Sequence, residues 1–556
     1  MKLTLILLTA SLLAVASTPN VAAIAEEQWA VVSISPISDA NPLPGWANNQ
    51  FDARRFMRRW CDTLVMRYPG TKWRGGHDEG VFTCTLPAFY LMSGYPQART
   101  FTLGLADDFI RSPMAEACNC FLTEKDATGF KSTTGRKYHG YPADYSCIIH
   151  GPENYSWFLA PAAWIGGPNY TDALRDASEH IGNFTPDTPP WYDWKEHRFR
   201  SLLLGTKRVR DYPPYNFETL NHVKLMQAAS NTYGLTGDKR YLDLLVDWCD
   251  KWADIIVSAG DNAWPIARYP VPDDKVKEIY GTYAYSDKSR ANSDLIQLLL
   301  DVNRFSPHPK YVAAAKSMID TALTYSDSMT GNLVAKYRAL TGDKSFDERM
   351  LKVADADMAR GDLPAAILVV RHPPEGSDFG DMNYVMIDGK DTARKDIRSV
   401  ANIMAAWAIT GDVKYAERGL QIAAGRVSSS WYLLDGREIG CQGKSNSRNA
   451  VSIADGLSAL GFSSQGGYGM FEGEIPWFEV HYCQEDGRPG TPENLMTLYS
   501  NAGGKNIIRF SNSNDASTVL YIQSRKPGVA LPKFDKTPGW TKLMIPAKSN
   551  GIIEAK

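Results

Sequence analysis

Histidine is scarce in this chain, yet four of its nine copies fall in polar, aromatic-rich segments that run directly into apolar helical segments. They are His77, His139, His150 and His222. Imidazole changes its charge near neutral pH, so a histidine beside a substrate can accept or donate a proton. One such residue alone is more often structural than catalytic, but four that converge favour acid–base chemistry at a shared rim.

The first chemistry that these segments could support is β-elimination next to a sugar carboxylate. It needs a base, a group that stabilises the enolate, and an acid for the leaving oxygen. We assign the base to His222, with His150 as the alternative, and charge neutralisation to the adjacent Asn221. Tyr285 is predicted to protonate the leaving group, and Arg290 to hold the substrate carboxylate. The structural alternatives are a helix cap for Asn221 and a surface ion pair for Arg290.

Glycoside hydrolysis is the second chemistry that fits. It generally needs two carboxyl groups on opposite sides of the bond, one of them with a raised pKa. Asp78, Glu79 and Glu153 lie in the same polar segments. Glu79 and Glu153 could instead occupy first helical turns, where the helix dipole stabilises a negative charge. The residues predicted to contact the substrate in either chemistry are His77, Asp78, His139, Tyr145, Glu153 and Arg290.

A turn sequence that recurs three times indicates which elements position the candidate site residues. The sequences TGDKRY, TGDKSF and TGDVKY begin at Thr236, Thr341 and Thr410. The glycine is expected to end one helix in the left-handed conformation, and the Asp or Thr beside it to cap the next helix. The aromatic residue is expected to pack back into the hairpin. Related breaks occur at Gly94, Gly166 and Pro307.

Each of these turns joins an Ala-rich apolar segment to an amphipathic one, which predicts a helical hairpin. A helix that is apolar nearly all round must be buried, so a ring with apolar inner helices and amphipathic outer helices is favoured. The segments Asn49–Tyr68 and Ala450–Phe462 could complete it, giving six or seven hairpins. An open α-solenoid is the alternative, but it would not need long polar insertions at one end of each pair.

The pattern over about residues 45–465 resembles the (α/α)6 and (α/α)7 toroids of polysaccharide lyases and six-hairpin glycosidases. The resemblance implies an active site on the rim where the long segments enter the inner helices. It implies an enzyme acting on a polysaccharide or oligosaccharide, with a lyase of uronate-containing glycans, including rhamnose–glucuronate linkages, as the first interpretation. A glycosidase and a non-catalytic glycan-binding protein are the alternatives.

The end of the chain has a different composition. NIIRF and ASTVLYIQS are strand-like, with β-branched and aromatic residues between Gly and Pro. We therefore predict an all-α toroidal catalytic domain over 24–490 and a small β-rich appendage over 491–556, which could cover one end of the ring or bind sugar.

The first 23 residues have the features of an export signal. Lys2 precedes the apolar run Leu3–Val15, and Val21–Ala23 is a small-x-small cleavage site. We expect a secreted protein, extracellular or periplasmic, without a membrane span. The eight cysteines are an even number, which in an exported protein favours disulfides. Cys84, Cys118, Cys120 and Cys147 are predicted to pair among themselves or with Cys61.

Other classes of function have no support in the sequence. The net charge of −2 gives no reason to expect nucleic-acid binding. Glycine-rich phosphate loops, nucleophile elbows and metal-binding motifs are absent from the sequence, so no cofactor is expected, although a structural divalent cation stays open. Glu474, Glu479 and His481 are close together in EIPWFEVHYC, which we interpret as a closing β element with a disulfide rather than a metal site.

Overall fold

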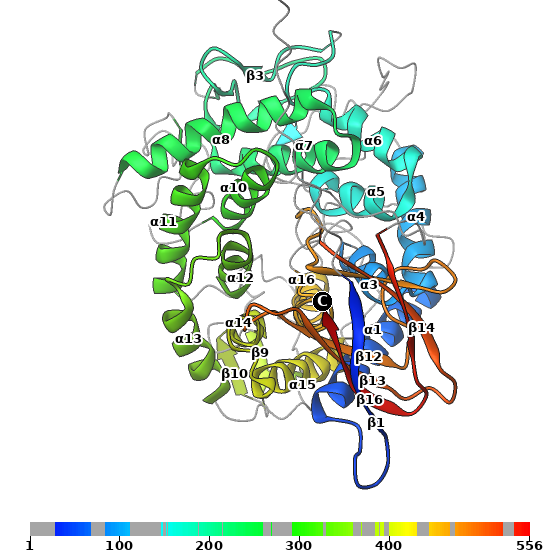
Figure 1. The fold of residues 1–556 in the computed structure, drawn as a ribbon. Helices are drawn as coiled ribbons and strands as arrows, with labels where there is room; N and C mark the ends of the chain where they lie inside the picture. The colour runs from blue at the N-terminus through cyan, green and yellow to red at the C-terminus, as the bar shows by residue number, and fades with distance from the viewer. Residues whose placement is uncertain are drawn as a thin grey trace, which may run out of the picture.

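A computed structural model describes most of the chain. The described residues are 28–67, 84–111, 146–147, 152, 154–186, 188–213, 215–259, 268–269, 292–325, 330–359, 368–369, 384–387, 390–393, 400–430, 444–467, 473–525 and 539–556. The described part is mostly helical, with antiparallel β-sheets near the C-terminus. Figure 1 shows the helices arranged around a common centre.

The helices form an inner and an outer series (Figure 1). The inner helices are α3 (Thr85–Ser93), α5 (Ala160–Gly166), α7 (Val223–Thr236), α10 (Ser293–Phe305), α12 (Thr330–Thr341), α14 (Val400–Thr410) and α16 (Lys444–Ser464). The outer helices are α1 (Gly45–Arg67), α4 (Pro96–Arg111), α6 (Pro168–Ser178), α8 (Lys239–Ala259), α11 (Pro309–Tyr325), α13 (Asp347–Ala359) and α15 (Val413–Ser430). Each inner helix contacts the next, and α16 contacts α3. α1 packs on α15 and α16, as expected for the segment that begins at Asn49.

The repeated turns have the geometry that the sequence predicts. Gly237, Gly342 and Gly411 have φ of +68°, +71° and +66°, in the left-handed region that disfavours a β-carbon. In the turn at Gly237, the side chain of Asp238 accepts a hydrogen bond from the backbone of Arg240 at 3.0 Å. Equivalent bonds to Asp343 and Asp412 recur in the other two turns. The predicted glycine stop is therefore confirmed in all three turns. The aspartate caps the next helix after Gly237 and Gly411, whereas α13 begins only at Asp347, four residues after Asp343.

The aromatic residue of these turns does more than pack inside its own hairpin. The hydroxyl of Tyr415 in α15 donates to Asp355 of α13 at 2.7 Å. Tyr170 in α6 donates to Asp107 of α4 at 2.9 Å in the same manner. Similar bonds run from Tyr95 to Asp62, from Tyr311 to Asp250 and from Tyr241 to the carbonyl of Arg175. Each tyrosine thus ties its outer helix to the preceding outer helix.

The C-terminal strands form two sheets around a second hydrophobic core. The four-stranded sheet has the order β1 (Trp29–Pro36), β16 (Ser549–Ala555), β13 (Ile507–Asn512) and β12 (Leu495–Ser500). The three-stranded sheet has the order β11 (Val480–Gln484), β14 (Thr518–Ser524) and β15 (Thr541–Ile545). Figure 1 shows β1 beside strands from the other end of the chain. β1 and β11 both supply apolar residues to this core. The β-rich unit therefore includes two strands outside the predicted appendage at 491–556.

The two sheets, which we call the β module, cover the end of the ring where the inner helices finish. Gln484 of β11 donates to the carbonyl of Ser93, the last residue of α3, at 3.1 Å. The indole of Trp407 in α14 donates to the carbonyl of Tyr499 at 3.1 Å. At the opposite end, most inner helices begin directly after segments that lie outside the described residues. The starts of the inner helices therefore mark the rim at which the sequence analysis expects the active site.

Short elements complete the described structure. They are a π-helix η1 (Asn154–Leu159), a 3-10 turn η2 (Leu220–His222), and the strands β2 (Ser146–Cys147), β3 (Tyr192–Asp193), β4 (Arg198–Phe199), β5 (Leu203–Leu204), β6 (Glu218–Thr219), β7 (Arg268–Tyr269), β8 (Leu368–Val369), β9 (Tyr384–Ile387) and β10 (Lys390–Ala393). Within the ranges given above, no helix has the length and apolar character needed to span a membrane.

The cysteines correct one prediction. Cys61 in α1 and Cys249 in α8 are buried and carry free thiols, so Cys61 does not pair with the cysteine cluster. Burial raises the pKa of both thiols well above the usual range, which makes them unreactive at neutral pH. Both behave as small apolar residues between helices. The side chains of Cys118, Cys120, Cys147 and Cys441 lie outside the described part of the chain.

Candidate active site

A stripe of polar residues interrupts the apolar surface of two inner helices. In α7 it consists of Lys224, Gln227 and Asn231, at the spacing i, i+3, i+7 that places residues on one face of a helix. In α10 the same spacing holds Asp294, Gln297, Asp301 and Arg304. Buried polar groups are costly unless they are paired, so such a stripe inside a helical ring needs a specific reason.

The centre of the stripe is a buried group of charges. The ammonium of Lys336 in α12 lies 3.0 Å from Asp301 Oδ1 and 3.7 Å from Glu474 Oε2. The three side chains are 1%, 5% and 3% exposed, in that order. Glu474 comes from the segment before β11, which joins the ring to the β module. Its neighbour Gly473 accepts a hydrogen bond from Asn231 at 2.8 Å, which fastens this segment to α7.

Two carboxyl groups of this cluster hold protons more tightly than usual. Burial raises the pKa of Glu474 to about 7; Lys336 opposes the shift, and Asp301 and Asp294 add to it. Burial also raises the pKa of Asp294, against the charge of Lys224 and a hydrogen bond from Gln227. A carboxyl group that titrates near neutral pH can act as a general acid or base. Perturbed groups of this kind mark candidate functional sites.

Several buried polar atoms of η1, α7, α10 and α12 have no hydrogen-bond partner among the described residues. They are Asn154 Oδ1, Trp157 Nε1, Gln227 Oε1, Ser230 Oγ, Gln297 Oε1, Asp301 Oδ1 and Lys336 Nζ. Lys336 and Asp301 attract each other as ions, but their geometry is not that of a hydrogen bond. Such atoms also occur elsewhere in the described structure, but here they accompany a buried ion pair, and water or a ligand could complete their bonding. Both donors and acceptors are present, which suits a hydroxyl-rich ligand.

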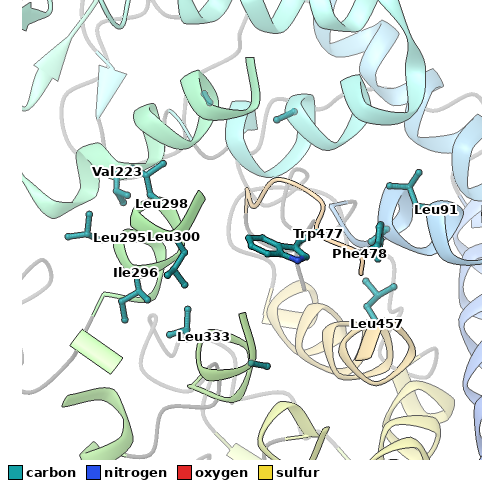
Figure 2. Close-up of a cluster of buried hydrophobic side chains, with 14 of the residues drawn as sticks. Leu91, Val223, Leu295, Ile296, Leu298, Leu300, Leu333, Leu457, Trp477 and Phe478 are labelled. Atoms are coloured by element: carbon teal, nitrogen blue, oxygen red, sulfur yellow. The ribbon is translucent and has the colours of Figure 1, made fainter. Parts of the chain in front are cut away.

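Aromatic rings lie against the cations of the cluster. Lys224 Nζ lies 4.4 Å from the ring centroid of Trp157 in η1. Trp477 lies inside the ring of helices, and Figure 2 shows it directed toward the side of α10, while Phe478 faces Leu91 and Leu457. The centroid of the Trp477 ring lies 5.5 Å from Lys336 Nζ. These contacts hold the two lysines beside the carboxyl groups.

The structure does not support His222 as a catalytic base. Its side chain is 0% exposed and stacks on Phe199, with 4.7 Å between ring centroids. Nδ1 accepts a hydrogen bond from the backbone of Thr219, and Nε2 donates to the carbonyl of Ser201, each at 3.0 Å. Burial lowers its pKa to about 4, so the ring stays neutral. The residue closes a capping box at the start of α7 and is structural.

Asn221, the neighbour of His222, is half-buried in η2, one turn before Lys224. Its backbone N–H donates to Thr219 Oγ1 at 3.2 Å, so Thr219 is the capping residue here. The position of Asn221 at the start of an inner helix agrees with the predicted rim, and its role in substrate binding stays a prediction. The remaining predicted residues lie outside the described part of the chain: His77, Asp78, Glu79, His139, Tyr145, His150, Glu153, Tyr285 and Arg290.

The sequence interpretation missed the residues that the structure brings together. Asp301 and Lys336 lie within segments interpreted only as apolar inner helices, and Asp294 ends a polar rim segment in which it was given no role. The signal was the helical spacing of polar residues in α7 and α10, which a fully buried helix does not need. Glu474 was noted but assigned to a closing β element. Nothing local marks it, because its partners come from α10 and α12, more than a hundred residues earlier.

A metal centre has no support in the described ranges. The described residues include no group of three or more His, Cys, Asp or Glu side chains arranged to bind a metal ion. Glu479 and His481, weighed above as ligands, have other surroundings. Glu479 accepts from the indole of Trp477 at 2.9 Å. Burial and the charges of Arg525 and Arg304 lower the pKa of His481 to about 3.

Comparisons with known proteins add little. No family model matches the chain, and no curated protein matches it. Among solved structures, it is similar to a GH127 beta-L-arabinofuranosidase from Geobacillus stearothermophilus T6, with 9% identity and a TM-score of 0.29 over 94% of this chain and 81% of that chain. A TM-score this low does not establish a shared fold, so the function has to be argued from the residues of this protein.

Proposed function

We propose that the protein is a carbohydrate-active enzyme that cleaves glycosidic bonds inside a closed toroid of seven helical hairpins. The buried group of Glu474, Asp301 and Lys336 carries the proposal, because it joins a carboxyl group that titrates near pH 7 to a set of unsatisfied polar atoms. Sugar hydroxyls both donate and accept hydrogen bonds, so they could satisfy both kinds of atom. The contacts that return from α16 to α3 support the closed ring.

The proposed chemistry is acid–base cleavage. Protonated Glu474 gives its proton to the glycosidic oxygen as the bond to the leaving sugar breaks. A second carboxylate, Asp294 or Asp301, then stabilises the positive charge that develops on the sugar or activates the water that attacks it. The nearby ammonium of Lys336 limits the rise in the pKa of Glu474, so that the acid is still strong enough to give up its proton.

The charge of the described site favours hydrolysis over β-elimination. Three carboxyl groups, Asp294, Asp301 and Glu474, face two ammonium groups, Lys224 and Lys336. Lys224 and Lys336 already have carboxylate neighbours, whereas Arg304 of the same stripe has two guanidinium nitrogens, Nε and Nη2, without a hydrogen-bond partner among the described residues. The preference for hydrolysis therefore rests on the carboxyl groups and not on a lack of cations. The predicted lyase would depend on Tyr285, Arg290 and His150, and it remains the alternative that experiment must exclude.

A glycan screen read in two ways tests the proposal. The purified protein is incubated with neutral and uronate-containing polysaccharides, and reducing ends and ultraviolet absorbance are both recorded. We expect reducing ends without the absorbance of an unsaturated sugar. Absorbance that rises with each cut would replace hydrolysis by β-elimination. Binding without any product would leave only a glycan-binding protein.

Export of the protein is proposed on the signal-like N-terminus alone. A polysaccharide-cleaving enzyme would meet its substrate outside the cytoplasm, which agrees with that proposal. The test is expression of the full chain in a bacterial host, followed by fractionation and N-terminal sequencing. We expect the mature protein to start just after Ala23; an unprocessed protein that begins at Met1 would contradict export.

A further inference from the structure

Trp477 connects the β module to the proposed catalytic cluster. The indole of Trp477 donates to Glu479 Oε1 at 2.9 Å. Arg525, directly after β14, lies with its guanidinium carbon 4.4 Å from the centroid of the Trp477 ring and its Nε 3.6 Å from Glu479 Oε2. The backbone N–H of Arg525 donates to the carbonyl of Glu479 at 2.8 Å. Two segments of the module therefore hold the indole in place.

The same tryptophan also contacts the cluster inside the ring. Lys336 Nζ lies 5.5 Å from its centroid, and the guanidinium carbon of Arg304 lies 4.8 Å from it. An aromatic ring attracts cations placed over its face, and the attraction grows in a desolvated setting. Lysine has a flexible four-carbon stem, so such a contact restricts where its ammonium can lie.

We propose that Trp477 and Arg525 are positioning residues that hold the ammonium of Lys336 between Asp301 and Glu474, so that the β module is a working part of the active site. This inference rests on the proposed function. It gives the C-terminal strands a role: they fix the charges around Glu474 from the end of the ring where the inner helices finish. The substrate would enter at the opposite rim.

The contact between Trp477 and Lys336 affects Glu474 through the charges that surround them. The charged groups that act on Glu474 are Lys336 from α12 and Asp301 and Asp294 from α10. Those around the indole and its neighbour His481 are Arg304, Lys336, Glu479 and Arg525. Lys336 is the cation that lowers the pKa of Glu474. If its ammonium moves away, the coulombic attraction falls and the pKa of Glu474 rises further.

The variant Arg525→Met tests the proposal, and Arg488→Met is its matched control. Arg488 also joins the β module to the ring, because its Nη1 donates to the carbonyl of Gly94 at 3.3 Å, but it does not contact Trp477 in the described structure. We expect Arg525→Met to let the ammonium of Lys336 move away from Glu474 and so shift the alkaline limb of the kcat/KM profile upward, by at most about one pH unit, the order of shift that loss of a nearby opposite charge gives a carboxyl group. Arg488→Met should leave that limb in place. Arg525→Lys, which keeps a cation over the indole, should restore it.

A second variant separates position from charge. Trp477→Leu keeps every charge but removes the ring that both Arg525 and Lys336 contact, and we expect it to move the limb in the same direction. An unchanged limb in both Arg525→Met and Trp477→Leu, with only a lower Tm, would overturn the proposal and leave these residues a purely structural role.

A readout that needs no substrate separates this inference from the proposed function. The difference in stability between each protein and its Glu474→Gln derivative, followed from pH 5 to 9, reports the titration of Glu474. We expect its midpoint to rise in the Arg525→Met background and to stay in the Arg488→Met background. If no glycan is cleaved, the proposed function fails, but this midpoint still decides whether Trp477 and Arg525 position the charges.

Discussion

Glu218 and Glu474 are both buried carboxyl groups with a raised pKa, yet their surroundings differ. Glu218 accepts hydrogen bonds from the indoles of Trp248 and Trp252, both at 2.8 Å, and from the backbone of Phe199 at 2.5 Å. Glu474 has one cation at 3.7 Å and neighbours with unsatisfied atoms. Burial raises the pKa of Glu218 to about 8 and that of Glu474 to about 7.

The comparison shows that a raised pKa does not identify a catalytic group by itself. A carboxyl group whose oxygens already accept hydrogen bonds from protein donors has a structural role. Glu218 is an example, because it fastens β6 to α8. A carboxyl group such as Glu474, which lies among unpaired donors and acceptors, can still form hydrogen bonds with a ligand. His222 belongs with Glu218 in this respect, since both of its ring nitrogens are used by backbone groups.

The largest expected effect separates the two glutamates by activity. Glu474→Gln cannot donate a proton, and we expect kcat to fall by about 10²- to 10⁴-fold, the usual contribution of a positioned acid. Glu218→Gln is the control, because it also replaces a buried carboxyl group by an amide but should keep kcat. Both are measured on the glycan found in the screen, with circular dichroism to verify folding. Equal losses in the two variants would remove the distinction.

A stability effect of intermediate size should be shared by both glutamates. In each case the folded state keeps a proton that the unfolded chain releases near pH 4.5, so the free energy of unfolding falls as pH rises, up to about pH 7 for Glu474 and about pH 8 for Glu218. Replacing either by Gln should flatten this decline. Urea unfolding at pH 5, 6, 7 and 8 measures it. A steeper decline in the variants would contradict the assigned shifts.

The smallest expected effect concerns a polar contact far from the cluster. Tyr415→Phe removes the hydroxyl that donates to Asp355, and we expect a loss of about 1 kcal/mol of stability with unchanged kcat. The chain contains its own precedent, since Phe346 occupies the equivalent place in the TGDKSF turn. Denaturant unfolding of Tyr415→Phe beside the wild type gives the value. A change in kcat would mean that the outer contacts influence the centre.

Much of the fold follows from local rules, and so it could be predicted. The TGD turns fix their own geometry, because the glycine conformation and the aspartate cap depend on residues next to each other. The same holds for the apolar inner helices and for the strands after residue 494. The partners of Tyr415 and Tyr170 on the preceding helices could not be predicted. The repeat fixes the position of each tyrosine in its own helix, but not which residue of the preceding helix accepts its hydrogen bond.

The candidate site was much less accessible from sequence. His222 stood out because histidine is rare, but rarity does not reveal whether its nitrogens are free. Glu474 and Lys336 have no local feature that pairs them, and they meet only because the chain returns through the ring after α16. The usable local signal was the polar stripe of α7 and α10, which conflicts with wholly apolar inner helices.

The pairing of β1 with β16 has a consequence for how the protein is made. Trp29 lies opposite Ala555, so the first strand has no edge to join until the ribosome has finished nearly the whole chain. Until then its exposed backbone groups are open to wrong pairing, a recognised hazard of strand edges. The four-stranded sheet can therefore be completed only after the last strand has been made, and until then β1 has no partner.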